Sequence, residues 1–389
     1  MGPVSLSAHP SPQAPGPGDD ARPLRIGIEA HVVGRRQTGN ERVMSNLITA
    51  LGEISGHRLV VYFTLPEAAE EWRSRTGDRL EIRMLRPTNP FVRIPLALPW
   101  LARRDRLDVL LSHVNAPPVA PCPVVTLIHD VAFARHPEYF SRLERAYMNR
   151  TVPASMRWSD AVITVSGFTR DEVVALYGIP AAKITVAHNG VDPQFLDGVS
   201  RSAPVEPPFF LAIGNLQPRK NLVTLIRAYH RLVRERPDVP ERLVIVGKEF
   251  FRAESLYAEA DELRRAGRIV FTGYLADADL VGLLQRATAF AYPSVYEGFG
   301  LPVVEAMAVG APTMAADIPV MREVAGADAM LLPVTDEAAW ANGLARMASD
   351  PALRSSLAAR GQERAARFSW ERSARAVLST LERAARRAR

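Results

Sequence analysis

The sequence predicts an α/β protein built from two Rossmann-like domains with parallel sheets. Short apolar runs that are typical of buried strands alternate with helical patterns along almost the whole chain. With 389 residues the chain is too long for one ordinary hydrophobic core, so two domains are expected. The segment 197–208 concentrates Gly, Ser and Pro, which indicates a linker. Two such units would face each other across a cleft at the carboxyl ends of their strands.

The elements follow in order along the chain. In the first domain, 22–196, we expect strands at 24–28, 59–64, 109–112, 124–128, 161–165 and 184–187, and helices at 41–52, 142–157 and 169–176. In the second domain, 209–370, we expect strands at 209–213, 243–246, 269–272, 289–292, 312–315 and 330–332, and helices from 222, at 278–285 and at 301–309. An amphipathic helix at 371–389 ends the chain. Residues 1–21 are rich in Pro, Gly, Ser and Ala, which predicts a disordered tail and not a secretory signal.

Composition and charge restrict the class of protein. Hydrophobic residues make up 47% and charged residues 23%, which is globular composition. The formal charge of +6 comes mostly from dispersed arginines, which suits anionic small ligands or an anionic membrane surface. It does not suit nucleic acid, because no basic stripe is interleaved with aromatics. Cys122 is the only cysteine, so an intramolecular disulfide and a cysteine-based metal cluster are excluded. The longest apolar stretch, 94–102, is too short to span a bilayer, and we expect a soluble, cytoplasmic protein.

The most informative segment is Tyr292-Pro-Ser-Val-Tyr-Glu-Gly-Phe-Gly-Leu-Pro-Val-Val-Glu305. It carries two carboxylates eight residues apart, Glu297 and Glu305, with Gly298 and Gly300 between them. The glycines permit close backbone approach, and the N–H groups at the start of the following helix suit a phosphate. Glu297 lies in the loop, while Glu305 lies about one turn into the helix, where it can reach a ribose hydroxyl. This pattern predicts a nucleotide-sugar site; the alternative is an ordinary strand–loop–helix with two surface glutamates.

The same segment resembles the Glu-x7-Glu signature of glycosyltransferase family 4, the retaining GT-B enzymes. The resemblance covers nearly the whole chain from Leu24 onward. It implies that Glu297 holds the hydroxyls of the donor sugar and Glu305 the ribose. It also implies a donor-binding role for the residues between the two carboxylates and a final helix that crosses back to the first domain. The donor-binding residues implied between them are Gly298, Phe299, Gly300 and Leu301.

A second motif, Gly214-Asn-Leu-Gln-Pro-Arg219-Lys220-Asn221, follows the first strand of the second domain. Two adjacent cations at a strand-to-helix turn can neutralise a diphosphate, although a solvated turn is the simpler alternative. In family 4 the matching Arg and Lys bind the donor phosphates, and Gly214 belongs to the same turn. The pair Asp277-Ala-Asp279 fits a metal-binding pattern, but it opens a predicted helix, where Asp is favoured as N-cap and in the first turn. We therefore expect no metal, and assign the cation role to Arg219 and Lys220.

Three further positions match the family's donor site. His129, in Ile128-His129-Asp130, ends a strand and matches the histidine beside the donor sugar; Asp130 is expected to brace the loop or His129. Gly39 follows the first strand and matches the glycine loop near donor and acceptor, with Asn40 as plain helix N-cap an equally good interpretation. Leu275 follows a strand of the second domain, where family members hold the base through the backbone.

The resemblance implies a retaining, metal-independent hexosyltransferase without a separate cofactor. Its donor is a nucleoside-diphosphate sugar and its acceptor a glycan or lipid-linked hydroxyl. The motifs resemble those of bacterial mannosyltransferases, which favours GDP-mannose over UDP-glucose. The rival is a non-catalytic GT-B-like binding or scaffold protein; it predicts a damaged donor site, yet every motif position is intact. An epimerase of the same fold fits the motifs less well.

The segment 91–106 raises the question of a membrane. It combines Trp100, several aliphatic residues and four arginines, which is compatible with weak peripheral association with an anionic bilayer. The alternative is a short core helix with solvated arginines, and Pro95 and Pro99 favour it because they limit a long amphipathic helix.

Overall fold

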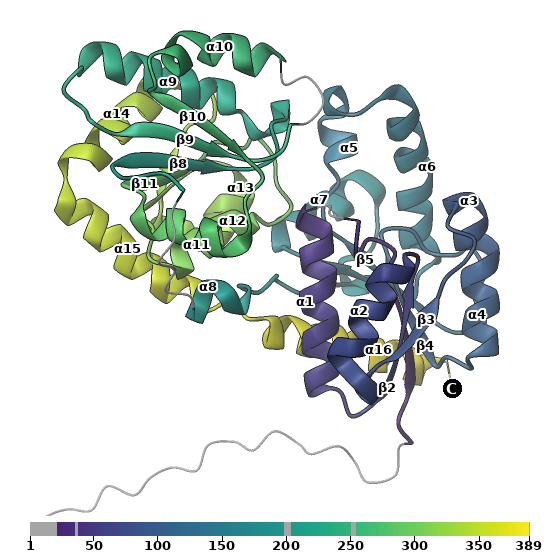
Figure 1. The fold of residues 1–389 in the computed structure, drawn as a ribbon. Coiled ribbons are helices and arrows are strands. Elements are labelled where there is room, and N and C mark those ends of the chain that lie inside the picture. Colours follow the sequence, from purple (N-terminus) through teal and green to yellow (C-terminus); the bar gives the residue numbers. More distant parts are fainter. Residues whose placement is uncertain (1–21, 36–37, 198–203, 250–253, 389) are drawn as a thin grey trace, which may run out of the picture.

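The computed structural model describes residues 22–35, 38–197, 204–249 and 254–388, which form two α/β domains (Figure 1). The predicted tail, 1–21, lies outside the described residues, as do half of the predicted linker, 198–203, and residue 389. The predicted fold class is confirmed: each domain is built on a fully parallel sheet, with seven strands in the first domain and six in the second.

The first sheet has the strand order β3-β2-β1-β4-β5-β6-β7. Its strands are β1 (Arg25–Glu29), β2 (Arg58–Phe63), β3 (Glu81–Met84), β4 (Val109–His113), β5 (Val124–Ile128), β6 (Ala161–Thr164) and β7 (Ile184–Val186). The six predicted strands are present within one or two residues. The seventh, β3, was not predicted, because this edge strand alternates charged and apolar residues and only Ile82 in it is buried.

The helices of the first domain lie between these strands. They are α1 (Thr38–Ile54), α2 (Pro66–Thr76), α3 (Pro90–Val92), α4 (Leu98–Arg104), α5 (Ala132–Arg135), α6 (Arg142–Trp158) and α7 (Gly167–Tyr177), with α8 (Pro193–Asp197) at the end. Short turns of other helix types are η1 (Gly77–Arg79), η2 (Arg93–Ala97), η3 (Pro137–Tyr139) and η4 (Ala181–Lys183). Asn40 is not the N-cap of α1, because the helical backbone already includes Thr38 and Gly39. Ser166 caps α7 by accepting a hydrogen bond from the Thr169 N–H at 3.0 Å.

The second sheet has the order β10-β9-β8-β11-β12-β13, and all six of its strands were predicted. They are β8 (Phe209–Ile213), β9 (Arg242–Val246), β10 (Ile269–Gly273), β11 (Ala289–Tyr292), β12 (Thr313–Ala316) and β13 (Met330–Leu332). The helices are α9 (Leu222–Glu235), α10 (Glu254–Arg265), α11 (Asp277–Arg286), α12 (Leu301–Ala308), α13 (Pro319–Val324), α14 (Glu337–Ser349) and α15 (Pro351–Ala365), with the turns η5 (Pro218–Lys220) and η6 (Gly326–Asp328).

Strand order determines where loops from distant parts of the sequence meet. In the first sheet β1 lies beside β4, and in the second β8 lies beside β11, so the chain changes direction at these two points. Ligands of open parallel sheets bind beyond the carboxyl ends of the strands at such switch points. The loops after β8 and β11 contain Arg219, Lys220 and Glu297. The histidines discussed below lie at the end of β4 and in the loops after β1 and β5.

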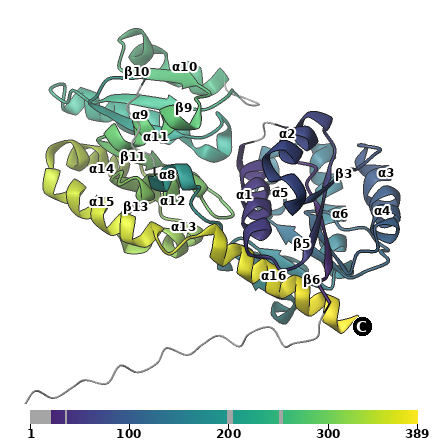
Figure 2. The same cartoon turned by 60° about the horizontal axis from the view of Figure 1, so that its bottom comes forward.

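The last helix, α16 (Trp370–Arg387), leaves the second domain and packs on the first, against α1 and the strands β4 to β7 (Figure 2). The Thr380 hydroxyl donates to Thr185 Oγ1 at 3.0 Å, and Glu382 Oε1 lies 3.1 Å from His57 Nε2. Its buried residues include Val377 and Leu381. In the described part of the chain, every helix is too short or too polar to cross a membrane.

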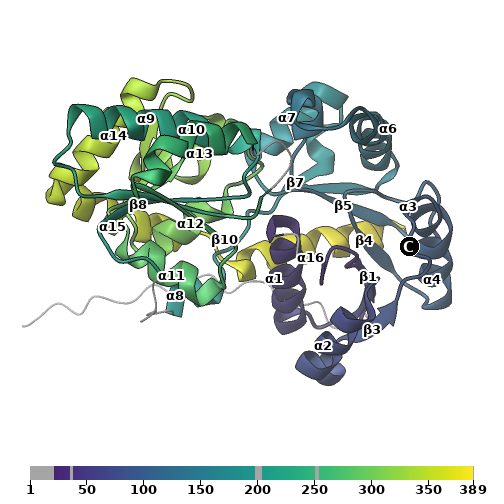
Figure 3. The same cartoon turned by 45° about the horizontal axis from the view of Figure 1, so that its top comes forward.

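The two domains also contact each other directly. Helix α7 of the first domain packs against α13 of the second (Figure 3). Glu323 in α13 accepts hydrogen bonds from the Gly167 and Phe168 N–H groups at 2.7 and 2.8 Å, so a carboxylate of one domain sits at the start of a helix of the other. The Ser166 hydroxyl donates to the Gly298 carbonyl oxygen at 2.6 Å. The loop that carries Glu297 is therefore fastened to the first domain.

Candidate functional site

Glu297 is the centre of a buried charge cluster between the loops after β8 and β11. Lys220 Nζ lies 2.6 Å from Glu297 Oε1, and Arg219 Nη1 lies 3.2 Å from Oε2. The Tyr292 hydroxyl donates to the same Oε1 at 2.9 Å and accepts from Lys220 Nζ at 2.8 Å. Three residues that the sequence assigned to the site, the adjacent Arg219 and Lys220 and the distant Glu297, thus meet at one point. Tyr292, which was not assigned to the site, joins them.

The electrostatics of this cluster keep Glu297 ionised. Burial raises the pKa of Glu297, but Arg219 and Lys220 outweigh burial and bring that pKa down to about 2. Burial lowers the pKa of Lys220, and Arg219 adds to this effect, although Glu297 opposes it. Burial also lowers the pKa of Arg219, but Glu297 and Asp130 raise it overall. The carboxylate is therefore ionised and in direct contact with two cations, close to the start of α12.

Glu305 forms a second centre with a cation from the other domain. It lies one turn into α12 and is 2% exposed, and Arg42 Nη2 from α1 lies 3.0 Å from its Oε1. Asp192 Oδ2 lies 4.0 Å from the same Arg42 nitrogen. Burial raises the pKa of Glu305 to about 7, although Arg42 opposes this effect. The sequence did not predict a role for Arg42, because only the fold shows that it contacts Glu305, 263 residues away. The only feature of the sequence that pointed to it is a cation in the first turns of α1.

The glycine-containing loop between these carboxylates touches the first domain through its backbone. A Cβ on Gly298 would lie 1.9 Å from the His129 carbonyl oxygen, so only glycine fits there. Gly300 has φ of 97° and is the N-cap of α12, and Leu301 is the first residue of that helix. The Phe299 side chain is buried against Phe368, with ring centroids 5.4 Å apart. The side chain of Phe299 is therefore not accessible to a ligand, and only its backbone can contact one.

His129 lies at the end of β5 with 9% of its surface exposed. Its Nε2 is 2.8 Å from His113 Nε2, and burial lowers the pKa of His129 to about 4, so the ring is neutral at physiological pH. Asp130 Oδ1 accepts the Ala132 N–H at 3.0 Å, and its Oδ2 lies 3.9 Å from Arg219 Nη1. Asp130 thus braces its own loop and faces the charge cluster across the domain junction.

The remaining predicted site residues are Gly214, Leu275 and Gly39. Gly214 has φ of 152°, and a Cβ placed on it would lie 3.3 Å from methylene carbons of the Lys220 side chain. Leu275 is half-buried in the loop after β10. Gly39 is the second residue of α1, and no described atom lies within 4 Å of the place where a side-chain Cβ would stand.

The two aspartates of the suspected metal pattern start α11. Asp277 and Asp279 lie in the first turn of this helix, but neither is the N-cap, because Ala276 occupies that position. Asp277 raises the pKa of Glu305 electrostatically, so it faces the second centre. Among residues 22–35, 38–197, 204–249 and 254–388, no group of three His, Cys, Asp or Glu side chains is arranged to hold a metal ion.

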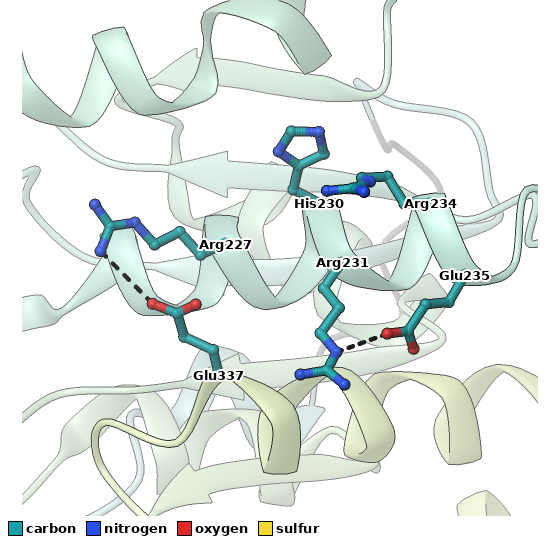
Figure 4. A pocket seen from close by; sticks show the side chains of 6 residues that line it. All are labelled: Arg227, His230, Arg231, Arg234, Glu235 and Glu337. Atoms are coloured by element: carbon teal, nitrogen blue, oxygen red, sulfur yellow. Dashed lines mark hydrogen bonds and ion pairs between the residues drawn. The ribbon is translucent and has the colours of Figure 1, made fainter.

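A shallow surface pocket elsewhere in the second domain contains none of the predicted site residues (Figure 4). It lies on the outer face of α9 and the start of α14, and is lined by Arg227, His230, Arg231, Arg234, Glu235 and Glu337. Arg231 pairs with Glu235 at 2.7 Å and Arg227 with Glu337 at 3.6 Å, so much of its charge is neutralised within the wall. Arg227 and Arg231 are surface cations, whereas the side chains of Arg219 and Lys220 are largely buried.

Two parallel-sheet Rossmann-like domains joined by a returning C-terminal helix define the GT-B class. Two solved structures are similar over nearly the whole chain. The Anabaena protein HepE in complex with UDP and glucose has a TM-score of 0.70 and 19% identity, covering 92% of this chain and 99% of that one. The sucrose-phosphate synthase from Thermosynechococcus elongatus has a TM-score of 0.72 and 20% identity, covering 94% and 100%.

Sequence comparison gives the family. Residues 38–195 match the model of Glycosyltransferase Family 4, and residues 199–364 match that of glycosyl transferases group 1. The O-antigen chain mannosyltransferase B of Escherichia coli is 32% identical over 256 residues, covering 64% of this chain and 67% of that protein. The glycogen synthase of Mycobacterium tuberculosis is 32% identical over 295 residues, covering 71% and 68%. The chain belongs to the group 1 and family 4 glycosyltransferases.

Proposed function

We propose that this glycosyltransferase is a retaining, metal-independent enzyme that moves mannose from GDP-mannose to an acceptor hydroxyl during glycan or glycolipid synthesis. The observation that carries the proposal is the buried contact of Arg219 and Lys220 with Glu297, at 3.2 and 2.6 Å, beside the start of α12. Two cations and a helix N-terminus together stabilise a departing diphosphate. The carboxylate between them is ionised and can accept hydrogen bonds from sugar hydroxyls.

The proposed reaction needs no protein nucleophile. The bond between the anomeric carbon and the leaving phosphate oxygen breaks, and the acceptor oxygen bonds to that carbon on the same face. The acceptor proton passes to the departing phosphate oxygen. Arg219 and Lys220 stabilise the charge that develops on the diphosphate, which is also the role of a metal in other transferases. Glu297 and His129 position the sugar, and Glu305 binds the ribose.

The choice of donor is supported by the names of relatives. The name of the O-antigen chain mannosyltransferase B supports a mannosyl donor for this chain. So does the name of the serotype-specific mannosyltransferase WbdA of Escherichia coli, which is 28% identical over 281 residues. The HepE structures contain UDP, glucose or UDP-glucose, which keeps UDP-glucose as the second candidate. No helper cofactor is part of the proposal.

The proposal is tested first by donor binding and then by transfer. We expect GDP-mannose to raise the melting temperature of the purified chain more than other nucleotide sugars do, because a ligand that binds only the folded state stabilises it. Transfer to saccharide and lipid-linked acceptors should persist in EDTA, and NMR of the product should show the anomeric configuration of the donor. Inverted product or dependence on a metal would refute the mechanism, and binding without any transfer would favour the non-catalytic rival.

We further propose that the chain works at the cytoplasmic side of an anionic membrane, where a lipid-linked acceptor lies. The residues 90–104 run through α3, η2 and α4 with one side buried by Ile94, Leu98 and Leu101. The opposite side exposes Phe91, Leu96 and Trp100 at 70, 65 and 60%. Arg103 and Arg104 are exposed at the end of the same segment.

This surface continues onto the start of α6. Leu143 is 85% exposed there, and the rings of Phe91 and Tyr147 pack edge-on with centroids 5.5 Å apart. Arg142 and Arg145 are exposed on the same turn of α6. Exposed apolar side chains rimmed by arginines are complementary to an anionic lipid surface. As the prolines led us to expect, the segment is not one long amphipathic helix: it is divided into α3, the π-turn η2, which contains Pro95, and α4, which has Pro99 near its start.

A further inference from the structure

His113 is a second histidine at the carboxyl end of the first sheet, adjacent to His129. In the register of β4 and β5, His113 pairs with Leu127, and His129 follows two residues later on the same side. The two Nε2 atoms are 2.8 Å apart and the ring centroids 4.8 Å apart. The exposed fractions are 3% for His113 and 9% for His129, so this hydrogen bond is shielded from water.

His113 is in turn held by Glu29, a fully buried carboxylate at the end of β1. Glu29 Oε2 accepts one hydrogen bond from the backbone N–H of His113 and one from the Ser112 hydroxyl, each at 3.2 Å. Glu29 Oε1 lies 2.9 Å from His31 Nδ1 and 3.3 Å from Arg93 Nε. Burial raises the pKa of Glu29, but His31 and Arg93 lower it overall, so the carboxylate is ionised. The end of β4 is therefore anchored to β1, and His113 has little freedom to move.

The proton shared by the two histidines can be assigned. Burial lowers the pKa of His113 well below its ordinary value and that of His129 to about 4, so both rings are neutral and each carries one ring proton. The Nδ1 of His113 is buried and has no hydrogen-bond partner in the described part of the chain. A proton on this atom would leave a buried N–H unpaired, which is rarer in proteins than an unpaired acceptor. His113 therefore carries its proton at Nε2 and donates it to His129.

We propose that His113 is a positioning residue that fixes the orientation and tautomer of His129, so that His129 keeps its own proton at Nδ1. His129 then offers the donor sugar an N–H group, which recognises a hydroxyl oxygen. This inference rests on the proposed function only in so far as the partner of that N–H is a sugar. A group that orients a ligand-binding histidine through its other ring nitrogen typically contributes strongly to binding or activity.

The tautomer is tested directly by NMR of the full chain with ¹⁵N-labelled histidine, in the absence of any substrate. The chain has eight histidines, and the His129 signals are identified by their loss in His129→Ala. We expect a protonated Nδ1 and an acceptor-type Nε2 for His129 in the wild type, and loss of this preference in His113→Leu. A wild-type His129 that carries its proton on Nε2 would overturn the assignment. Because no donor is needed, this result is independent of whether the chain transfers a sugar.

Kinetics test the positioning role. We expect His113→Leu to lower kcat about ten- to a hundredfold with little change in the donor KM, and His113→Gln to recover most of kcat, because its amide N–H can donate to His129 Nε2. The matched control is His57→Leu, since His57 is a partly buried histidine that pairs with Glu382 at 3.1 Å, on the α16 side of the domain. It should keep the wild-type kcat. Unchanged kinetics in His113→Leu, or no recovery in His113→Gln at equal melting temperature, would refute the role.

Discussion

Arg42 of the first domain lies 3.0 Å from Glu305 of the second, so the carboxylate assigned to the ribose has a cationic partner in the free protein. The ion pair spans the domain junction and is partly sheltered, with the Arg42 side chain 24% and the Glu305 side chain 3% exposed. A ribose that binds Glu305 must compete with this guanidinium or share the carboxylate with it. The proposed ribose contact of Glu305 therefore predicts that the affinity for the donor depends on Arg42, a residue outside the recognised motifs.

The raised pKa of Glu305 predicts a pH-dependent stability. The folded value of about 7 exceeds the ordinary value of 4.5, so the folded state binds the extra proton between these two values. Its contribution is fully present below pH 4.5 and is lost as the pH rises through 7. In Glu305→Gln this dependence should disappear. Relative to that variant, the free energy of unfolding of the wild type should fall by about 3 kcal/mol between about pH 4.5 and 8, measured by urea denaturation. A constant difference would contradict the raised pKa.

The charge cluster predicts a loss of activity that surface cations do not share. Arg219→Ala/Lys220→Ala removes both contacts to Glu297 and should lower kcat about a hundred- to a thousandfold, because the leaving diphosphate loses its stabilisation. The matched control is Arg231→Ala/Arg234→Ala, which removes two cations from the outer face of α9 (Figure 4). Initial rates of sugar transfer provide the comparison. Wild-type transfer by the first double variant would remove these residues from the site.

Gly298 makes a steric prediction. A methyl group there meets a backbone oxygen, that of His129, at 1.9 Å, so the loop with Glu297 must shift away from the first domain. Gly298→Ala should lower the melting temperature and reduce kcat about a hundredfold, since small displacements of positioned groups are costly. Both are measured on the purified variant. Full activity with normal stability would show that this close contact is dispensable.

Gly39, unlike Gly298, is expected to tolerate a side chain in the free protein. No described atom lies within 4 Å of the position that an alanine Cβ would take, and alanine is better than glycine in a helix by about 0.5–1 kcal/mol. Gly39→Ala should therefore keep or raise the melting temperature of the free protein. If the donor approaches the start of α1 closely, the same variant should raise the donor KM several-fold. An unchanged KM would leave Gly39 outside the donor site.

The exposed side of residues 90–104 predicts membrane binding. Leu96→Ala and Trp100→Ala should each reduce co-sedimentation with vesicles that contain phosphatidylglycerol, and Leu196→Ala, at a site 57% exposed on α8, should not. Arg103→Glu/Arg104→Glu should weaken binding further, and high salt should weaken it in the wild type, because the attraction to anionic lipid is screened. Equal binding to neutral phosphatidylcholine vesicles, or none at low salt, would refute an anionic docking surface.

The fold was largely predictable because most of its strands are apolar runs, and the central strands are buried on both sides. The strand β3 escaped prediction because, at the sheet edge, Glu81 and Arg83 stay half-exposed and pair with other charges. In the site, Glu297, Arg219 and Lys220 were predictable from short motifs that each follow a strand. Arg42, His113 and Glu29 were not, because their roles come from contacts between distant segments. The register of β4 and β5 places His113 beside His129, and that register is a property of the folded sheet.

The position of α16 has a consequence for how the protein is made. Its residues are synthesised after those of the second domain, yet it covers α1 and the strands β4 to β7 of the first. While the ribosome is still translating the second domain, the first has all its strands but lacks the helix that buries Val377 and Leu381 against it. The newly synthesised first domain therefore exposes an apolar surface until α16 has been made. Chaperones recognise surfaces of this kind. A premature stop within the second domain should leave both halves of the molecule incomplete.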